Sequence, residues 1–229
     1  MDHLLWKRVF SFKDVIKTSL FILALPAATL ITLYFVEVPL KYATLIFETV
    51  FILSIIAVFF IYAHKKKIPL SKLGFNKIKH KFRWMLISLV LGLFVIFIGG
   101  GLAAWVDEML EIGRSEQLTL PDGMDNNWLL FLHFQIFIGV LIPIAEEIYF
   151  RGLIFRYLRQ YKPFIFSALL SSFIFAVLHI HPSLMIFAFI LGLTSALVYE
   201  KSGNIIPALL VHIIVNSTVV NVFLLSQLS

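Results

Sequence analysis

Long apolar segments recur along this chain and set the strongest limit on its fold. A helix needs about 20 apolar residues to cross the hydrocarbon core of a bilayer. Sixty percent of the 229 residues are hydrophobic and 14% are charged, against about 25% charged in soluble domains. The sequence therefore predicts an all-α, polytopic integral membrane bundle of about seven transmembrane helices. We expect these spans at residues 18–36, 43–63, 84–106, 128–150, 164–180, 184–199 and 205–225.

Lysine and arginine side chains are unevenly distributed between the loops that these spans define. Of the 19 such residues, 17 lie before the first span or in loops on the same side, and only Lys41 and Arg114 lie on the other. Cytoplasmic loops carry an excess of Lys and Arg, so we predict a cytoplasmic N-terminus. The net charge of +6 is thereby explained without nucleic acid as a partner. We expect membrane lipids as partners, with the basic stretch 65–83 lying on anionic headgroups.

The two halves of the chain differ in the polar groups that they place at membrane depth. Residues 1–127 comprise three spans and an acidic outer loop, and we interpret them as a scaffold. Residues 128–229 comprise four spans with several polar side chains, and we interpret them as the catalytic core. Ionisable residues inside a bilayer are costly, so by default they indicate function. Glu48 and His133 have no partner at suggestive spacing, and we interpret them as packing or interface residues.

Two adjacent glutamates lie near the end of the fourth span. Glu147 and Arg151 are four residues apart, in the order that favours an ion pair on one helix face. Glu146 points about 100° away from Glu147, because a helix has 3.6 residues per turn. We therefore expect Glu147–Arg151 to be structural and Glu146 to face a cavity, where it could act as a general base. The two glutamates could instead be simple interface residues. The chain has no cysteine, which excludes a cysteine nucleophile and thiolate metal ligands.

Histidines and an asparagine occur in two later spans. His212 and Asn216 share one face of the last span, where either could bind a metal, orient a water or donate to an oxyanion. His179 follows Phe175 by four residues, so we expect the Phe ring to pack under the imidazole. A single intramembrane histidine is more often an interhelical hydrogen-bonding residue. Three helices that each carry a Glu or His favour a shared site, because unpaired polar groups are costly in lipid.

Four motifs follow one another over about residues 128–220. They are Glu146-Glu147-x-x-x-Arg151, Phe175-x-x-x-His179, Phe189-x-x-Gly192 and His212-x-x-x-Asn216. This set resembles the CPBP family, which comprises CAAX prenyl endopeptidases and bacteriocin-processing or immunity proteins. The third motif departs from the family, because Ala196 occupies the position of an expected second glycine. Small residues at 192 and 196 still let another helix approach closely.

The resemblance implies an all-helical intramembrane protease in which Glu146 activates the attacking water and His179 assists. It also implies that His212 and Asn216 stabilise the oxyanion. Supporting roles fall to Glu147, Arg151 and Phe175. The resemblance leaves the cofactor open. A zinc ion could bind to Glu146, His179 and His212 with one position free, or a metal-free, glutamate-activated water could perform the hydrolysis.

The depth of these residues sets a condition on the shared site. At a rise of 1.5 Å per residue, Glu146, His179 and His212 lie at the same depth only if two helices begin or end at other residues than the spans above. We predict that the fourth span continues as helix through Arg156 and that the fifth begins nearer Ser167. The site would then lie about halfway across the membrane and open to the cytoplasm.

The leading functional interpretation is a glutamate-dependent intramembrane endopeptidase in a bacterial cell membrane. It would cleave a membrane-associated substrate, either prenylated or a peptide precursor, near the cytoplasmic face. The alternative is a non-catalytic membrane partner or regulator that retains the protease fold, such as a bacteriocin immunity protein or an accessory to a sensor or cell-wall enzyme. A third interpretation is a proton-coupled transporter that uses the Glu and His residues as a relay. The lack of an internal repeat disfavours it.

Overall fold

The computed structural model describes residues 9–111 and 128–226, and all predicted spans within them are helical. Most of the predicted acidic loop lies outside the described residues, as do Lys7, Arg8 and Arg114. The first half contains α1 (Phe12–Phe35), α2 (Leu40–Lys65), η1 (Leu70–Leu73), α3 (Lys81–Phe94), η2 (Val95–Gly99) and α4 (Gly100–Met109). The second half contains α5 (Trp128–Ile136), η3 (Phe137–Leu141), α6 (Ile142–Glu147), η4 (Ile148–Phe155), α7 (Arg156–Arg159), α8 (Phe164–Val177), α9 (Pro182–Ser202) and α10 (Ile205–Ser226).

Six helical segments of the described chain are long and apolar enough to cross a membrane. This confirms a polytopic, all-helical membrane protein. The exception among the seven predicted spans is α8, whose 14 residues extend only about 21 Å, less than the roughly 30 Å hydrocarbon core. The chain turns directly after α8, where Ile180 has a φ of +59°. Helix α9 then begins at Pro182, in the first turn of a helix, where proline is favoured.

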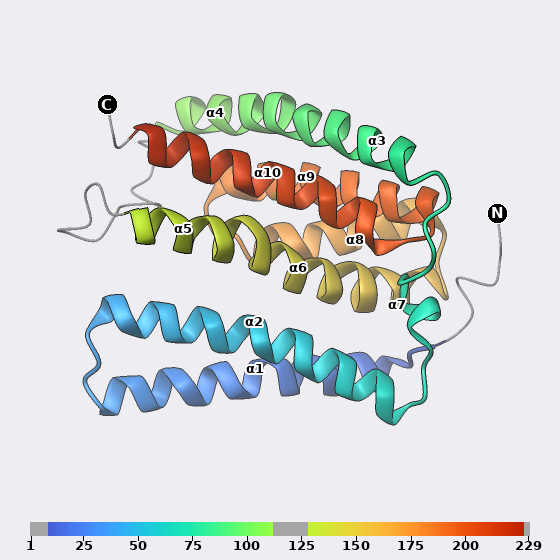
Figure 1. Cartoon of the computed structure of the whole chain (residues 1–229), viewed down its shortest axis with the longest axis horizontal. Coiled ribbons are helices and arrows are strands. Elements are labelled where there is room, and N and C mark those ends of the chain that lie inside the picture. Colours follow the sequence, from blue (N-terminus) through green and yellow to red (C-terminus); the bar gives the residue numbers. More distant parts are fainter. Residues whose placement is uncertain (1–8, 112–127, 227–229) are drawn as a thin grey trace.

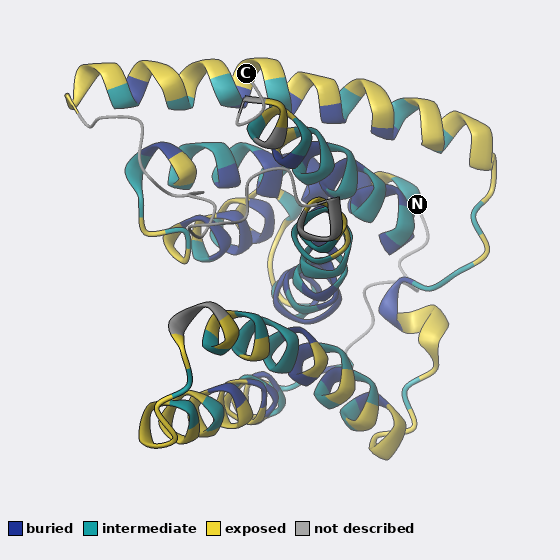
Figure 2. Ribbon diagram, turned by 60° about the vertical axis from the view of Figure 1, so that its left-hand side comes forward, coloured by how far each residue is buried: buried dark blue, intermediate teal, exposed yellow. Residues whose placement is uncertain are grey.

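The helices form three layers (Figure 1). The α3–η2–α4 rod lies on one side, where α3 packs against α10 and α4 against α9. The α1–α2 hairpin forms the opposite layer, and α2 contacts α6 and η4. Figure 2 shows that buried residues concentrate in the middle layer, while the outer helices expose apolar side chains such as Phe21, Phe35 and Phe97. The predicted division of the chain at residue 127 stays a prediction.

Small residues bring the helices of the middle layer close together. A Cβ added at Gly192 of α9 would lie 2.9 Å from the Ser172 side chain of α8. This confirms the predicted packing role of Gly192, and Ala196 one turn later is fully buried. A Cβ added at Gly92 of α3 would likewise lie 2.8 Å from Ile214 of α10. These close approaches fix the positions of α8, α9 and α10, which carry three of the four motifs.

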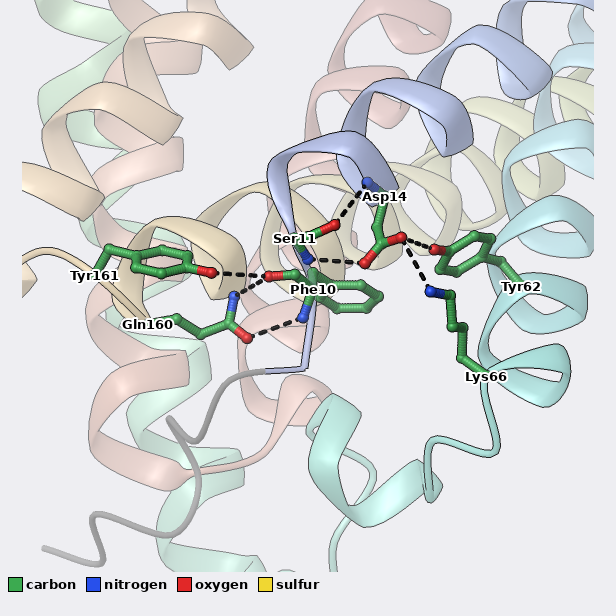
Figure 3. A network of polar contacts seen from close by, with 7 residues as sticks. All are labelled: Phe10, Ser11, Asp14, Tyr62, Lys66, Gln160 and Tyr161. Carbon is green, nitrogen blue, oxygen red and sulfur yellow. Dashed lines mark hydrogen bonds and ion pairs between the residues drawn. The ribbon is translucent and has the colours of Figure 1, made fainter.

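A polar network joins the start of α1 to the end of α7 (Figure 3). The Gln160 side chain accepts hydrogen bonds from the backbone N–H groups of Val9 and Phe10, and its amide donates to the Phe10 carbonyl at 3.2 Å. The Tyr161 hydroxyl donates to the same carbonyl at 3.4 Å. The Phe10 side chain is itself buried. This network, the N-terminal clamp, ties the hairpin to the helix that carries Glu146.

The same network continues from α1 to α2. Ser11 and Asp14 form a capping box, in which each side chain accepts from the other residue's backbone N–H. The Asp14 carboxylate also accepts a hydrogen bond from the Tyr62 hydroxyl and pairs with the Lys66 ammonium at 3.2 Å. The Asp14 carboxylate raises the pKa of Lys66, which lies just beyond the membrane span of α2. One carboxylate therefore caps α1 and holds both helices of the hairpin together.

Candidate active site

The fourth span continues as one helical rod through Arg159. The predicted extension through Arg156 is therefore confirmed. The predicted later start of the fifth span is wrong, because α8 begins at Phe164. Proline is tolerated just before the first turn of a helix, so Pro163 can act as the N-cap residue. Ser167 lies inside the first turns of α8, where its hydroxyl donates to the Pro163 carbonyl at 3.0 Å.

The two adjacent glutamates lie on α6, a short α-helical stretch between the π-helical segments η3 and η4. Such π-helical segments often occur at functional sites. Pro143 in α6 lacks a backbone N–H, so carbonyl groups one turn earlier lose their helical donor. Two side chains of α10 replace it.

The side chains of α10 that replace this donor are those of Asn216 and Ser217. The Asn216 amide donates to the Ile138 carbonyl at 3.1 Å, and the Ser217 hydroxyl donates to the Gly139 carbonyl at 3.3 Å. A Cβ at Gly139 would lie 2.9 Å from the Ser217 oxygen, so the two helices approach closely there. The motif search did not single out Ser217, Gly139 or Pro143. A proline inside an apolar span, four residues after a glycine, is the signal that points to this contact.

Glu147 forms the centre of a buried ionic network. Its Oε2 atom lies 3.2 Å from Arg151 Nε, as the spacing predicted, and its Oε1 atom lies 2.9 Å from His212 Nδ1. The Glu147, Arg151 and His212 side chains are at most 2% exposed. Arg151 also donates to the Gly192 carbonyl at 2.9 Å. Glu147 therefore joins the fourth span to α10, and Arg151 joins it to α9.

Glu146 has a different environment from its neighbour. Its side chain is 21% exposed, against 1% for Glu147, and its carboxylate lies 3.4 Å from His212 Nε2. His212 thus has a glutamate on each ring nitrogen. A carboxylate only accepts hydrogen bonds when it is ionised, so an ionised Glu147 fixes the proton of His212 on Nδ1. The Nε2 atom then faces Glu146.

Phe175 is the ring around which the other motif residues gather. Its centroid lies 4.8 Å from the His179 ring and 5.7 Å from the His212 ring, both edge to face. The Arg151 guanidinium lies 5.4 Å from the same centroid. His179 Nδ1 lies 3.0 Å from the Phe175 carbonyl. Because a carbonyl accepts only, this nitrogen carries a proton, and Nε2 of a neutral His179 is left as an acceptor.

A cavity of about 230 Å³ brings four predicted site residues together: Glu146, His179, His212 and Asn216. Its walls are otherwise apolar and come from η3, α6, α9 and α10. The four side chains thus line one cavity, and the roles predicted for them stay predictions. Glu48 and His133 do not line this cavity, and the His133 ring stacks on Phe137 at 4.3 Å between centroids.

The cavity does not open in the predicted direction. Its lining follows α10 from His212 onward to Val220 and follows the fourth span backward from Glu146 to Ile138. Both directions lead away from the basic loops. The predicted opening toward the cytoplasm is wrong, because side chains such as Phe155 and Tyr199 fill the bundle on that side and are completely buried.

The arrangement of donors was compared with the needs of a metal ion. A protein zinc site requires three or four converging ligands at about 2 Å. In the described part of the chain, no three His, Asp or Glu side chains form a group that could hold a metal ion. The Nδ1 atoms of His179 and His212 bond to Phe175 and Glu147, which leaves only the Nε2 atom of each ring as a possible ligand. Since these residues do not fit a zinc site as they stand, we derive no reaction step through a metal.

Fold and site together define a polytopic membrane protein with a glutamate–histidine cluster inside its helical bundle. A family model described as "Type II CAAX prenyl endopeptidase Rce1-like" matches residues 127–218. The Bacillus subtilis (strain 168) protein named "Putative membrane peptidase YdiL" is 29% identical over 134 residues, which are 57% of this chain and 53% of that protein. The chain thus spans about half the length of the curated relative that it matches. No solved structure matches the chain.

These comparisons confirm the resemblance to the CPBP family. The matched residues 127–218 contain all four motifs, so the similarity to the family model covers the part of the chain that carries them. The relative is likewise named a membrane peptidase.

Proposed function

We propose that this protein is an intramembrane endopeptidase of a bacterial cell membrane in which Glu146 activates the attacking water. The observation that carries the proposal is the contrast between the two glutamates. Glu147 is buried and bound to Arg151 and His212, whereas Glu146 lies beside His212 Nε2 and lines the cavity. A general base must reach both the water and a proton acceptor or donor. Of the two glutamates, Glu146 is the one that lines the cavity.

The proposed proton pathway runs through Glu146 and is supported by the contacts of His212. Glu146 takes a proton from water while the hydroxide oxygen bonds to the scissile carbonyl carbon. The same proton is then delivered to the amide nitrogen as the C–N bond breaks, which leaves a carboxylic acid and an amine. Glu147 holds His212 in one orientation through Nδ1. This leaves His212 Nε2 beside Glu146, where it shares and buffers the proton.

Asn216 and His179 are the candidates for the oxyanion. The Asn216 amide carries two hydrogens, and one of them bonds to the Ile138 carbonyl. The second can donate to the negative oxygen that develops on the carbonyl. His179 lines the same cavity, and its Nε2 atom can donate only when the ring is protonated. A metal-free reaction is therefore compatible with the donors that are present.

The test is the set of uncleaved peptides in membranes of cells that express Glu146→Gln at the wild-type level. We expect substrate precursors to accumulate as they do in cells that lack the protein. Glu48→Gln is the matched control, because Glu48 is also an intramembrane glutamate but does not line the cavity. It should cleave like the wild type. Normal cleavage by Glu146→Gln would remove Glu146 as the base.

The same cells distinguish a catalytic protein from a non-catalytic membrane partner, such as an immunity protein. A phenotype that requires the protein but survives both Glu146→Gln and His212→Ala would support the non-catalytic partner. Purified wild-type protein that keeps its activity after prolonged chelation would support the metal-free reaction. Loss of activity that zinc restores would instead support a metal site.

A further inference from the structure

We propose that the substrate enters the site from the end of the bundle opposite the basic loops, as an apolar peptide segment lying in the outer half of the membrane. This inference rests on the proposed function, because it names the substrate class and the route to the same site. It is carried by three separate observations: a filled basic end, a loop that covers that end, and a cavity lining that becomes exposed in the other direction.

The basic end of the bundle is filled with buried side chains. Between Glu147 and the end of the fourth span, Leu153, Phe155 and Arg156 are fully buried. From α9, the Tyr199 side chain reaches Arg156 at 3.3 Å, and Tyr199 is also fully buried. From α10, Ala208 lies one turn before His212 and is 0% exposed. A peptide would have to displace this packing to reach Glu146 from the basic side.

The loop between α2 and α3 covers the same end. The Ile205 N–H at the start of α10 donates to the Gly74 carbonyl at 2.9 Å. Asn76 donates to the Gly203 carbonyl at 3.1 Å, and Asn204 donates in return to the Asn76 carbonyl. Gly74 has a φ of +89°, and a Cβ there would lie 2.6 Å from the Tyr199 ring. The loop therefore packs closely against the buried Tyr199 side chain.

The residues that line the cavity become more exposed toward the opposite end. Along α9 its lining passes from buried Leu191 and Ala188 to exposed Leu184. Along α10 it passes from buried His212 to exposed Val219. The lysines of the loop between α2 and α3 lie at the other end, so the positive-inside rule places this opening in the outer half of the membrane.

The lining indicates which kind of peptide fits. Apart from the site residues themselves, the walls are aliphatic or aromatic, with Ile138, Ile142 and Phe187 among them. No charged side chain other than those of the site lines the cavity in the described part of the chain. Burying a charge there would be costly, whereas apolar surface gains about 25 cal/mol per Å² on leaving water. The substrate should therefore carry apolar side chains next to the scissile bond.

The route can be tested without a known substrate, because the chain has no native cysteine. Single cysteines are introduced into the full-length protein and exposed to a charged, membrane-impermeant methanethiosulfonate. The reagent is applied to intact cells, with any outer envelope permeabilised, and separately to inside-out vesicles. Ala188→Cys and Ala208→Cys form a matched pair, since both alanines are at most 2% exposed and lie on opposite sides of His212. Val219→Cys reports on the mouth of the cavity.

We expect Ala188→Cys and Val219→Cys to react from the outer face only, and Ala208→Cys to react from neither. Ser71→Cys and Glu108→Cys calibrate the inner and outer faces, and labelling after denaturation shows that each cysteine is present and reactive. The inference is overturned if Ala188→Cys reacts only from the inner face or from neither face. Reaction of Ala208→Cys from the inner face, or of Ser71→Cys from the outer face, would overturn it as well.

The labelling pattern is independent of catalysis. The same pattern is expected when Glu146→Gln is combined with each cysteine, because access does not require the base. An inactive wild-type protein with outer-face labelling would contradict the proposed function and keep the route. An active protein with inner-face labelling would support the proposed function and contradict the route.

Discussion

Glu147→Gln should destabilise the protein far more than Glu146→Gln, although the two residues are adjacent. The Glu147 carboxylate is 1% exposed and bonds to both Arg151 and His212. Substitution by glutamine leaves the Arg151 charge buried without its counter-ion. It also places an amide N–H₂ group near the N–H groups of Arg151 and His212, which are donors as well. Removing one partner of a buried ion pair typically reduces the free energy of unfolding by about 3–5 kcal/mol.

This free energy corresponds to a measurable change in melting temperature. For chains of this size, 1 kcal/mol shifts the Tm by about 2–4 °C, so Glu147→Gln should lower it by roughly 6–20 °C. Glu146 is 21% exposed, and its carboxylate lies 3.4 Å from His212 Nε2. Its replacement should change the free energy of unfolding by about 1 kcal/mol or less, which is a few degrees.

The assay is thermal unfolding of the purified variants in the same detergent, followed by the loss of helical circular dichroism. Arg151→Gln is a second measurement on the same ion pair and should show a loss of similar size, because it leaves Glu147 unpaired. Combined with Glu147→Gln, it should lose less than the sum of the two single changes. Equal melting temperatures for Glu146→Gln and Glu147→Gln would refute the division of roles between the two glutamates.

Four further changes test other positions. Gly192→Val should reduce the free energy of unfolding by about 1–3 kcal/mol, because its Cβ would lie 2.9 Å from Ser172. Gly100→Ala should instead raise it by about 0.5–1 kcal/mol, because no atom lies within 4 Å of the added Cβ. Equal Tm values for these two variants would contradict the close helix contact at Gly192. Asn216→Leu should lose about 1–3 kcal/mol because the Ile138 carbonyl is left without its donor, and an unchanged Tm would exclude that role. Lys66→Met should change Tm little at high salt, since salt screens exposed ion pairs, which contribute little to stability; a large, salt-independent loss would contradict an exposed pair.

The seven helical segments were predictable from sequence because hydropathy and length determine which segments can cross a bilayer. The length of α8 was not predictable, because apolar residues continue through Leu178 and Ile180 after the helix has ended at Val177. Hydropathy does not register the positive φ at Ile180, which turns the chain toward α9. The η3 segment escaped prediction for a similar reason, since two of its carbonyl groups accept hydrogen bonds from Asn216 and Ser217 of α10.

Local spacing was enough to predict the contacts within one helix. The Glu147–Arg151 pair and the ring contact between Phe175 and His179 both follow from four-residue spacing. The contact of His212 with both glutamates depends on how α10 packs against the fourth span, and no spacing reveals it. The direction of the cavity depends in addition on which end of the bundle is filled.

The N-terminal clamp recognises the chain mainly through its backbone. Gln160 and Tyr161 contact the amide and carbonyl groups of Val9 and Phe10. Many side chains at position 9 should therefore be tolerated, whereas a proline there would remove one of the N–H groups that Gln160 binds. The contact spans about 150 positions of sequence. During synthesis, the α1–α2 hairpin can therefore form its contacts with Gln160 and Tyr161 only after α7 has been synthesised.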